Sequence, residues 1–183
     1  MEKLEKLLNN SFEQHEIYEQ ENEYKSISFE SNKLKEISIK QSKGFAVRAI
    51  RNSGLTFSSS SNYDFEKFNN NFIQLSEFPT KTSINFPGKK VESKNKVKIF
   101  SKEEFNIDNK YFINKLSENI KKVLKKFPDA LCDAEFDLGL GKSSLSNSNG
   151  LSIQSEESGV SFFISAQTIN GNDMLNIYNY ASS

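Results

Sequence analysis

The sequence predicts an α+β fold, made of duplicated α-β4 units whose antiparallel meander sheets pack on helices. Polar and apolar residues alternate over Tyr24–Ser60, which is typical of half-buried strands. Apolar residues recur at helical spacing over Asn109–Phe127. Both halves of the chain also show the same order of a helix, a long strand, a short strand and two further strands. This shared order predicts an internal duplication.

The first half begins with an expected helix over residues 2–12, whose apolar side carries Leu4 and Leu8. A long strand is expected over residues 14–30. Asn and Gly accept the positive φ angles of tight hairpins, so three turns are predicted. They fall at 31–32, 42–44 and 52–54. A second helix follows, with Asp64 in its N-cap region, and Pro79 prevents its continuation.

The second half repeats this order after a polar, lysine-rich stretch over residues 80–100, which we interpret as a linker. Residues 101–104 fit a helix capping box, and Pro128 ends the helix over 109–127. The expected strands cover 130–147, 151–156, 160–168 and 174–180, with turns at 148–150, before Gly159, and at 170–172. We therefore divide the chain into 1–79, 80–100 and 101–183, and we expect one compact domain.

Composition excludes several classes of protein. Basic and acidic side chains balance at 24 each, so no global charge favours nucleic acid. The single cysteine excludes an internal disulfide framework and fits a reducing compartment. No apolar run approaches the ~20 residues of a membrane-spanning helix, and no signal-peptide core is present. These features predict a cytoplasmic protein with neither a membrane nor a nucleic acid as its partner.

Five motifs follow one another along the whole chain. They are Ser26-x-Ser28-x-Glu30-x-x-x-Leu34-Lys35-Glu36, Gly44-x-x-Val47-Arg48, Gly54-x-x-Phe57-x-Ser59, Asn147-Ser148-x-Gly150, and Asp173-Met174 through Tyr178, Tyr180 and Ser182. In this order they resemble the N-terminal domain of the TldD/PmbA family, also labelled modulators of DNA gyrase. Two departures are Ala46, where the family usually has a second glycine, and residues 69–73, where an alanine-rich helix is usual.

The resemblance implies a metallopeptidase system that acts on peptides or unfolded segments. In this system, a His-Glu-x-x-x-His helix of the C-terminal domain binds zinc in one subunit type, and the PmbA-type subunit is catalytically silent. No residue of this sequence matches that motif, so we expect no catalysis and no cofactor in this chain. Zinc is implied only for the family's catalytic subunit. We therefore expect this chain to be the N-terminal part of a longer protein and to lack the family's C-terminal catalytic domain.

Few residues are candidates for chemistry. His15 and Cys132 have no partner motif, so we interpret the histidine as a surface or half-buried residue and the cysteine as a core residue. A nucleophilic Cys–His pair is a disfavoured alternative. Asp133, Glu135 and Asp137 would share one face of a strand, where three carboxylates could bind Mg²⁺ or Ca²⁺. We favour a solvent-facing row over a metal site.

We interpret the remaining motifs as structural rather than catalytic. Residues 139–144 lack the spacer and the following helix of a phosphate-binding loop. The lysines of residues 81–126 are interpreted as solvent-exposed residues of a linker and a helix face. Arg48 lies in an apolar strand, so we expect an ion pair that bridges sheet and helix, and secondly a contact to the catalytic domain or a peptide. Gly44, Gly54, Asn147 and Gly150 match family landmarks, which implies structural or interdomain roles for them.

The resulting hypothesis is a non-catalytic N-terminal domain that shapes the dimer and the substrate chamber of a TldD/PmbA-type peptidase. Its expected partners are a second TldD/PmbA-type subunit, in a homo- or heterodimer, and an extended peptide. An unpaired strand edge can bind a peptide backbone regardless of its side chains, and we expect strands 14–30 and 130–147 to supply that edge. The alternative is a free-standing protein- or peptide-binding adapter without peptidase activity.

Overall fold

A computed structural model describes residues 1–88, 101 and 103–183 and divides the chain into two compact units. Unit 1 comprises Met1–Glu21, Ser42–Lys98 and Gly141–Glu156, and unit 2 comprises Asn22–Gln41, Ile99–Leu140 and Glu157–Ser183. Each unit thus gathers segments that are distant in the sequence. The predicted division at residues 80–100 stays a prediction, and residues 89–100 of that linker lie outside the described residues.

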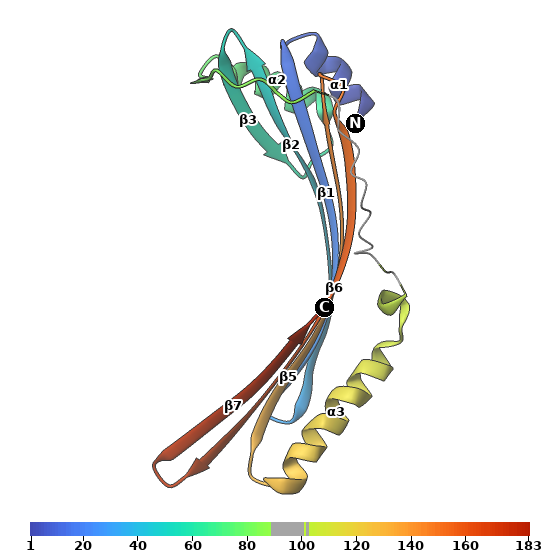
Figure 1. Cartoon of the computed structure of the whole chain (residues 1–183), viewed down its shortest axis with the longest axis vertical. Helices are drawn as coiled ribbons and strands as arrows, with labels where there is room; N and C mark the ends of the chain where they lie inside the picture. Colours follow the sequence, from blue (N-terminus) through green and yellow to red (C-terminus); the bar gives the residue numbers. More distant parts are fainter. Residues whose placement is uncertain (89–100, 102) are drawn as a thin grey trace. The chain divides into compact units, whose positions relative to one another are not determined.

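The described residues form three α-helices and seven strands, all but β4 labelled in Figure 1. The helices are α1 (Glu2–Asn9), α2 (Phe65–Leu75) and α3 (Asn109–Lys126), with a short 3₁₀ turn at Glu104–Asn106. The strands are β1 (Gln14–Glu30), β2 (Lys33–Arg51), β3 (Gly54–Ser60), β4 (Thr80–Lys81), β5 (Leu131–Asn147), β6 (Ser152–Asn170) and β7 (Asp173–Ser182). The α+β class and the antiparallel sheet predicted from the sequence are confirmed.

The strand order is β4-β3-β2-β1-β5-β6-β7. Strands β1 and β5, over residues 14–30 and 131–147, therefore lie in the middle of the order, each between two neighbours. The expectation that these two strands supply a free edge was wrong. Both sides of each of these strands are paired with a neighbour. The edges belong to β3 with its short neighbour β4, and to β7.

Four of the predicted turns are confirmed. Positive φ angles occur at Ser31 and Asn32, at Asn52 and Ser53, at Gly150 and at Gly171. The two turns predicted at 42–44 and before Gly159 are absent, because β2 and β6 each run on as one strand.

A close approach explains Gly44 but not Gly159. A Cβ at Gly44 would lie 3.1 Å from the Ser60 carbonyl oxygen, whereas one at Gly159 would lie at an ordinary van der Waals distance of 3.8 Å from that of Ser183. Each glycine thus faces the end of a neighbouring strand. The four-stranded units of the prediction become three long strands in each half, plus the two-residue β4 in the first half. The duplication itself stays a prediction.

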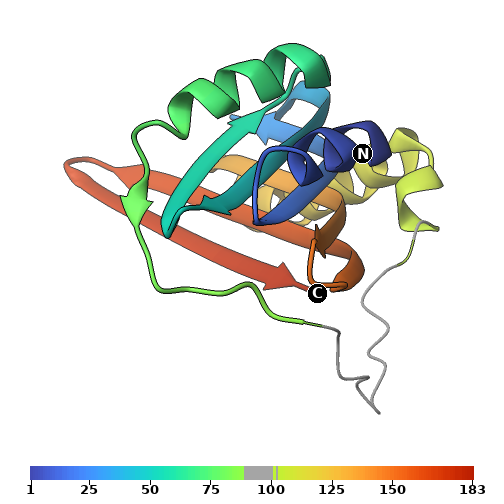
Figure 2. The same ribbon diagram turned by 90° about the horizontal axis from the view of Figure 1, so that it is seen from above.

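In unit 1, α1 and α2 pack beside each other on one face of β1, β2 and β3, as Figures 1 and 2 show. Both helices bury an apolar side against alternate residues of the strands. The buried cluster consists of Leu4, Leu8, Phe12, Ile17, Phe45, Val47, Ala49, Phe68 and Phe72. The Asp64 carboxylate accepts a hydrogen bond from the Lys67 amide at 3.1 Å, which confirms the predicted N-cap of α2.

In unit 2, the apolar stripe of α3 packs on alternate residues of β1 and β5. Its buried members are Phe112, Leu116 and Ile120. Phe112 stacks on Phe136 of β5 with ring centroids 4.0 Å apart. The described residues contain no helix long and apolar enough to cross a lipid bilayer.

Candidate functional site

Strand β3 presents a free edge. One side of β3 pairs with β2 from Gly54 to Ser60. On its other side, β4 pairs only with Gly54 and Leu55. Residues 56–60 therefore have no neighbouring strand on the outer side within the described structure, and we call this stretch the β3 edge.

The hairpin register determines which backbone groups of the β3 edge point outward. Arg51 pairs with Gly54 around the two-residue turn at 52–53, so the even-numbered residues of β3 exchange both hydrogen bonds with β2. The odd-numbered residues point away from β2. The Ser53 carbonyl agrees with this alternation, since it accepts a hydrogen bond from Thr82 on the outer side at 2.9 Å. Phe57 and Ser59 therefore direct their N–H and C=O groups outward.

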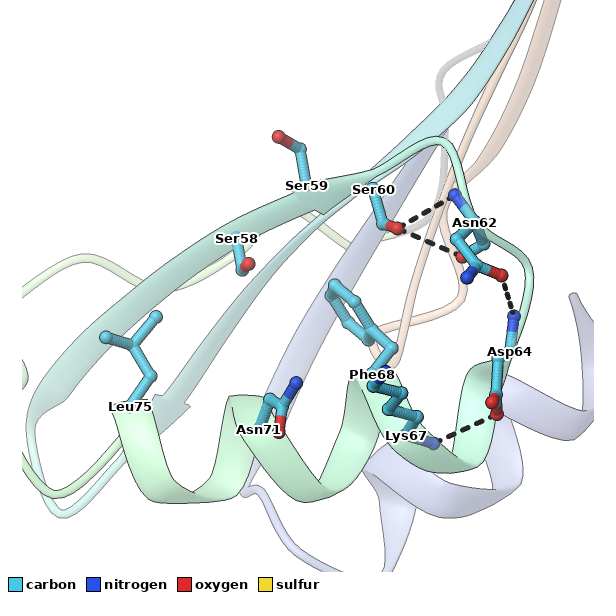
Figure 3. Close-up of a pocket in the computed structure, with 9 residues that line it drawn as sticks. All are labelled: Ser58, Ser59, Ser60, Asn62, Asp64, Lys67, Phe68, Asn71 and Leu75. Atoms are coloured by element: carbon cyan, nitrogen blue, oxygen red, sulfur yellow. Dashed lines mark hydrogen bonds between the residues drawn. The ribbon is translucent and has the colours of Figure 1, made fainter.

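A groove lies between the β3 edge and α2, and Figure 3 shows its lining. Its volume is about 380 Å³. Ser58 and Ser60 point toward the helix, Ser59 points away from it, and Phe68, Asn71 and Leu75 point from α2 toward the strand. Asn62, Asp64 and Lys67 complete the lining of this β3–α2 groove.

One end of the groove is closed by a local hydrogen-bond network. The Ser60 hydroxyl bonds to both the amide and the carbonyl of Asn62 at 2.9 and 3.0 Å. The Asn62 side chain accepts a bond from the Asp64 amide at 3.0 Å. Ser58, Ser59 and Asn71 have no side-chain hydrogen bond within the described part of the chain. The groove therefore has a fixed rim, an apolar floor and free polar groups along its length.

Most of the residues matched to family landmarks lie around the segment from Pro79 to Gly88. A Cβ on Gly54 would lie 2.5 Å from Pro79 Cγ, so only glycine permits this approach. Asn147 Nδ2 donates to the Pro87 carbonyl at 2.8 Å. Gly150, with a φ angle of 86°, forms the turn from which Asn149 donates to the Phe86 carbonyl at 2.7 Å. In Figure 2 this segment follows β4 on the side of the strands away from α2.

Arg48 holds the same segment from the strand face. Its Nε donates to Glu16 Oε1 at 3.0 Å, and its Nη2 also pairs with that oxygen. Its guanidinium lies 5.5 Å from the centroid of the buried Phe86 ring. The ion pair joins β2 to β1, so the expected bridge from sheet to helix was wrong. Four of the five landmark residues thus fix residues 79–88, whereas Gly44 faces the end of β3.

The acidic row of β5 faces away from the core, as its alternation predicts. Asp133 accepts a bond from the Ser31 amide at 2.9 Å, Glu135 from the Ser26 hydroxyl at 3.1 Å, and Asp137 from the Ser161 hydroxyl at 3.2 Å. Each carboxylate thus bonds to a neighbouring strand or turn. No group of three His, Cys, Asp or Glu side chains is placed to hold a metal ion among the described residues.

His15 and Cys132 lie in different units, and neither unit contains a Cys–His pair. His15 is only 3% exposed, so the expectation of a surface or half-buried residue was wrong. Burial lowers its pKa, and the nearby Glu5 opposes this shift. The expectation for Cys132 is confirmed, since it lies in the core and burial raises the pKa of its thiol.

The β3–α2 groove was not predicted from the sequence. From the sequence, we predicted only a strand end at Ser58–Ser60 and an amphipathic helix at α2. A signal was nevertheless present, because the end of this strand carries three small hydroxyl residues and neither charge nor proline. Natural sheet edges are usually protected by charged residues or by proline.

The described residues thus define an α+β domain with a free strand edge beside a groove of about 380 Å³. Residues 15–70 match the sequence profile of PmbA/TldA metallopeptidase domain 1. The resemblance to the TldD/PmbA family that the sequence indicates is thereby confirmed. The sequence has no significant match among the curated proteins compared.

Solved structures extend the similarity of fold to the whole chain. TldE from Thermococcus kodakarensis aligns with a TM-score of 0.86 and 17% identity, over 100% of this chain and 42% of that one. A proposed modulator of DNA gyrase from Thermotoga maritima gives 0.84 and 12%, over 100% and 43%. A similar protein from Bacteroides thetaiotaomicron gives 0.86 and 13%, over 98% and 43%. This chain therefore spans less than half the length of these structures.

Proposed function

We propose that the chain is a non-catalytic N-terminal domain of a TldD/PmbA-type metallopeptidase and that it shapes the substrate chamber of a dimer. The observation that carries the proposal is the match itself. Residues 15–70 match the first domain of the family, and the whole fold corresponds to 42–43% of TldE and of the Thermotoga maritima protein.

The family's metal does not fit the residues of this chain. Zinc sites need three or four His, Cys or carboxylate ligands in close array. The sequence holds one His and one Cys, and no suitable group of three ligands occurs in the described structure. Zinc and hydrolysis are therefore assigned to the family's catalytic subunit, and the role of this chain is to bind.

The β3 edge is the surface that we assign to an extended peptide. A strand added beside Phe57 and Ser59 would receive up to four backbone hydrogen bonds, and this recognition does not depend on the peptide's side chains. Alternate side chains of the peptide would enter the β3–α2 groove. There, Phe68 and Leu75 offer apolar contacts, and the small side chains of Ser58 and Ser60 leave room.

The affinity of this edge alone should be modest. Each hydrogen bond contributes about 0.5–1.5 kcal/mol net, and ordering the peptide opposes that gain. A dissociation constant of roughly 0.1–1 mM follows for the isolated chain, since four such bonds and a small apolar contact reach about 4–5 kcal/mol. Such weak, sequence-tolerant binding suits a chamber in which a second subunit also holds the substrate.

The test is binding of a fluorescein-labelled, uncharged, unstructured peptide, followed by anisotropy, to the wild type and two variants at one position. Phe57→Pro removes an outward N–H without touching the β2 ladder, and Phe57→Ala removes the same side chain but keeps the N–H. We expect Phe57→Pro to weaken binding about two- to tenfold relative to Phe57→Ala, since it removes one hydrogen bond that contributes about 0.5–1.5 kcal/mol. Equal binding by the two variants would show that the edge is not used.

Two further readouts keep the test decisive. If Phe57→Pro fails to fold by circular dichroism, amide hydrogen exchange of the wild type replaces it. In that measurement, the Phe57 and Ser59 amides should gain protection when peptide is added. The chain should hydrolyse none of the labelled peptide with or without added Zn²⁺, and hydrolysis would contradict the non-catalytic role.

A further inference from the structure

A second pocket lies on the sheet of unit 1 and is lined by four neighbouring strands. Its volume is about 270 Å³. The strands that line it are β2, β1, β5 and β6, which are adjacent in the strand order. The whole lining belongs to unit 1. Its charged residues are Lys43, Glu19, Glu21, Lys142 and Glu156, and we call it the charged pocket.

The charged pocket lies on the face of the sheet that carries the helices of unit 1. Glu19 and Glu21 follow Ile17 at alternate positions of β1, so the three side chains share one face. Lys43 shares a face with Phe45 on β2 in the same way. Ile17 and Phe45 belong to the buried cluster of unit 1. The pocket therefore begins where the apolar cluster ends, and charged side chains replace apolar ones on the same face.

The charges of the pocket alternate in sign from strand to strand. A lysine on β2 is followed by glutamates on β1, a lysine on β5 and a glutamate on β6. Opposite charges on neighbouring strands stabilise a sheet. Lys142 and Glu156 form such a pair, since Nζ lies 2.7 Å from Oε1. This pair satisfies both of its members, whereas the pairs of Lys43 are looser.

Lys43 lies near two carboxylates without a hydrogen bond to either. Its Nζ is 3.4 Å from Glu21 Oε2 and 3.7 Å from Glu19 Oε1, whereas N–H···O bonds span about 2.7–3.2 Å. Glu19 Oε1 instead accepts a bond from the Tyr63 hydroxyl at 3.1 Å. Burial and this bond raise the pKa of Tyr63 to about 12, so the hydroxyl stays a donor at neutral pH. Lys43 and Glu21 are thus a half-exposed cation and anion whose hydrogen-bonding capacity is not used within the described residues.

The charges of the pocket select a ligand that carries both signs. Its lining holds three carboxylates and two ammonium groups. A simple anion would meet the excess of negative charge, and a simple cation would meet Lys43 beside the carboxylates. A zwitterion avoids both repulsions. Its two charges must be close together, because Lys43 and Glu21 are 3.4 Å apart. A free α-amino acid meets this condition, since its ammonium and carboxylate groups are attached to the same carbon.

We propose that the charged pocket binds a free α-amino acid as its zwitterion. Lys43 Nζ donates to the carboxylate of the ligand, and the Glu21 carboxylate accepts from its ammonium group. The side chain of the ligand extends over Ser144 and Gln154, whose side chains make no hydrogen bond within the described residues. These groups favour a short polar side chain such as that of serine. The site goes beyond the proposed function and shares no residue with the β3–α2 groove.

Titration of the isotope-labelled chain with L-serine, followed by amide chemical shifts in two-dimensional NMR, tests the proposal. The Lys43 and Ser144 amides should shift saturably, with a dissociation constant on the order of 1 mM for two charge-assisted hydrogen bonds in a half-exposed site.

Three analogues test the charges of the ligand. N-acetyl-L-serine lacks the ammonium group, L-serinamide lacks the carboxylate, and ε-aminocaproate carries the two charges far apart. Each should bind at least about tenfold more weakly than L-serine. The absence of a saturable shift with millimolar L-serine, or equal binding of the analogues, would overturn the proposal.

Two variants test the residues of the pocket. Lys43→Gln and Glu21→Gln each remove one charge at a similar side-chain length, and each should weaken L-serine binding about tenfold. Lys35→Gln is the matched control, because Lys35 is a half-exposed lysine of β2 that pairs with Glu30 outside the pocket. It should bind L-serine as the wild type does. Unchanged binding by both pocket variants would overturn the proposal, and the analogue series on the wild type decides if a variant fails to fold.

The site and the proposed function can fail separately. Binding of L-serine without peptide binding would refute the β3 assignment alone. Peptide binding without L-serine binding would refute the amino-acid site alone.

Discussion

Arg48 and Glu16 form an asymmetric ion pair in which Arg48 Nε lies 3.0 Å from Glu16 Oε1. The Glu16 side chain is 5% exposed, whereas that of Arg48 is 51% exposed. The carboxylate therefore depends on the arginine for compensation, but the arginine keeps part of its contact with water. This asymmetry predicts that the two residues differ in their sensitivity to substitution.

Arg48→Met should cost about 2–3 kcal/mol of unfolding free energy, because it leaves a buried carboxylate unpaired. The value lies below that of a fully buried pair because Arg48 is half exposed. Glu16→Gln should cost only about 1 kcal/mol, since the arginine stays solvated. Urea unfolding measures both. The double variant should be more stable than Arg48→Met alone, and additive losses would contradict the pairing.

Gly54→Ala should destabilise the protein by about 1–3 kcal/mol through overpacking against Pro79. The added Cβ would lie 2.5 Å from Pro79 Cγ and 2.6 Å from Pro79 Cβ. Adding Pro79→Ala in the same chain should recover much of this loss. Gly159→Ala is the control, because its Cβ would meet only an ordinary contact at 3.8 Å. Equal thermal midpoints for the two alanine variants would refute the steric account.

Stability should fall in mildly acidic solution because His15 is buried as the neutral imidazole. Burial lowers its pKa in the folded state, so the unfolded chain binds the proton more readily. The contribution is complete above the unfolded pKa of about 6.5 and is lost as the pH falls from there toward the folded pKa.

The control for this prediction is His15→Phe, which keeps a ring but does not titrate. Between pH 7.5 and 5, the urea midpoint of the wild type should fall more than that of the variant. Carboxylates distant from His15 contribute equally to both proteins, so the difference between the curves reports the histidine together with its interaction with Glu5. Parallel curves would mean that His15 takes up its proton without cost to the fold.

The turn at Ser31 and Asn32 should depend on the Asn32 side chain as well as on its backbone. Asn32 Nδ2 donates to the Ala130 carbonyl at 3.0 Å, and Oδ1 accepts from the Cys132 amide at 2.8 Å. Asn32→Gly should lose about 1–2 kcal/mol through these bonds. Asn32→Ala should lose about 1 kcal/mol more, because its φ angle of 72° strains a residue with a Cβ. Equal unfolding free energies would show that the backbone strain is absent.

The sequence predicted the elements that depend on local pattern. The stripe of α3, the N-cap at Asp64 and the alternation around Asp133 all follow from spacing within a few residues. The turns at Gly44 and Gly159 were mispredicted for the same reason, because a glycine among polar residues looks alike in a turn and inside a continuous strand. Only the neighbouring strand, distant in the sequence, separates the two cases.

The candidate sites could not be predicted because they depend on strand order. Nothing local to residues 56–60 shows that β4 ends after two paired residues, and nothing local to Lys43 shows that Glu21 lies beside it. The partner of Arg48 was hidden for a similar reason. Glu16 stands among other glutamates of β1, such as Glu19 and Glu21, and only the β1–β2 pairing selects it.

Strands β1, β2, β5 and β6 each belong partly to unit 1 and partly to unit 2. The folding of each unit during synthesis therefore depends on segments that are made late. Unit 1 has all of its segments only after residue 156 has emerged from the ribosome. Unit 2 has all of its segments only after residue 183 has emerged. Neither unit can be cloned as a contiguous fragment, and a premature stop inside β6 or β7 would leave nascent strands without partners.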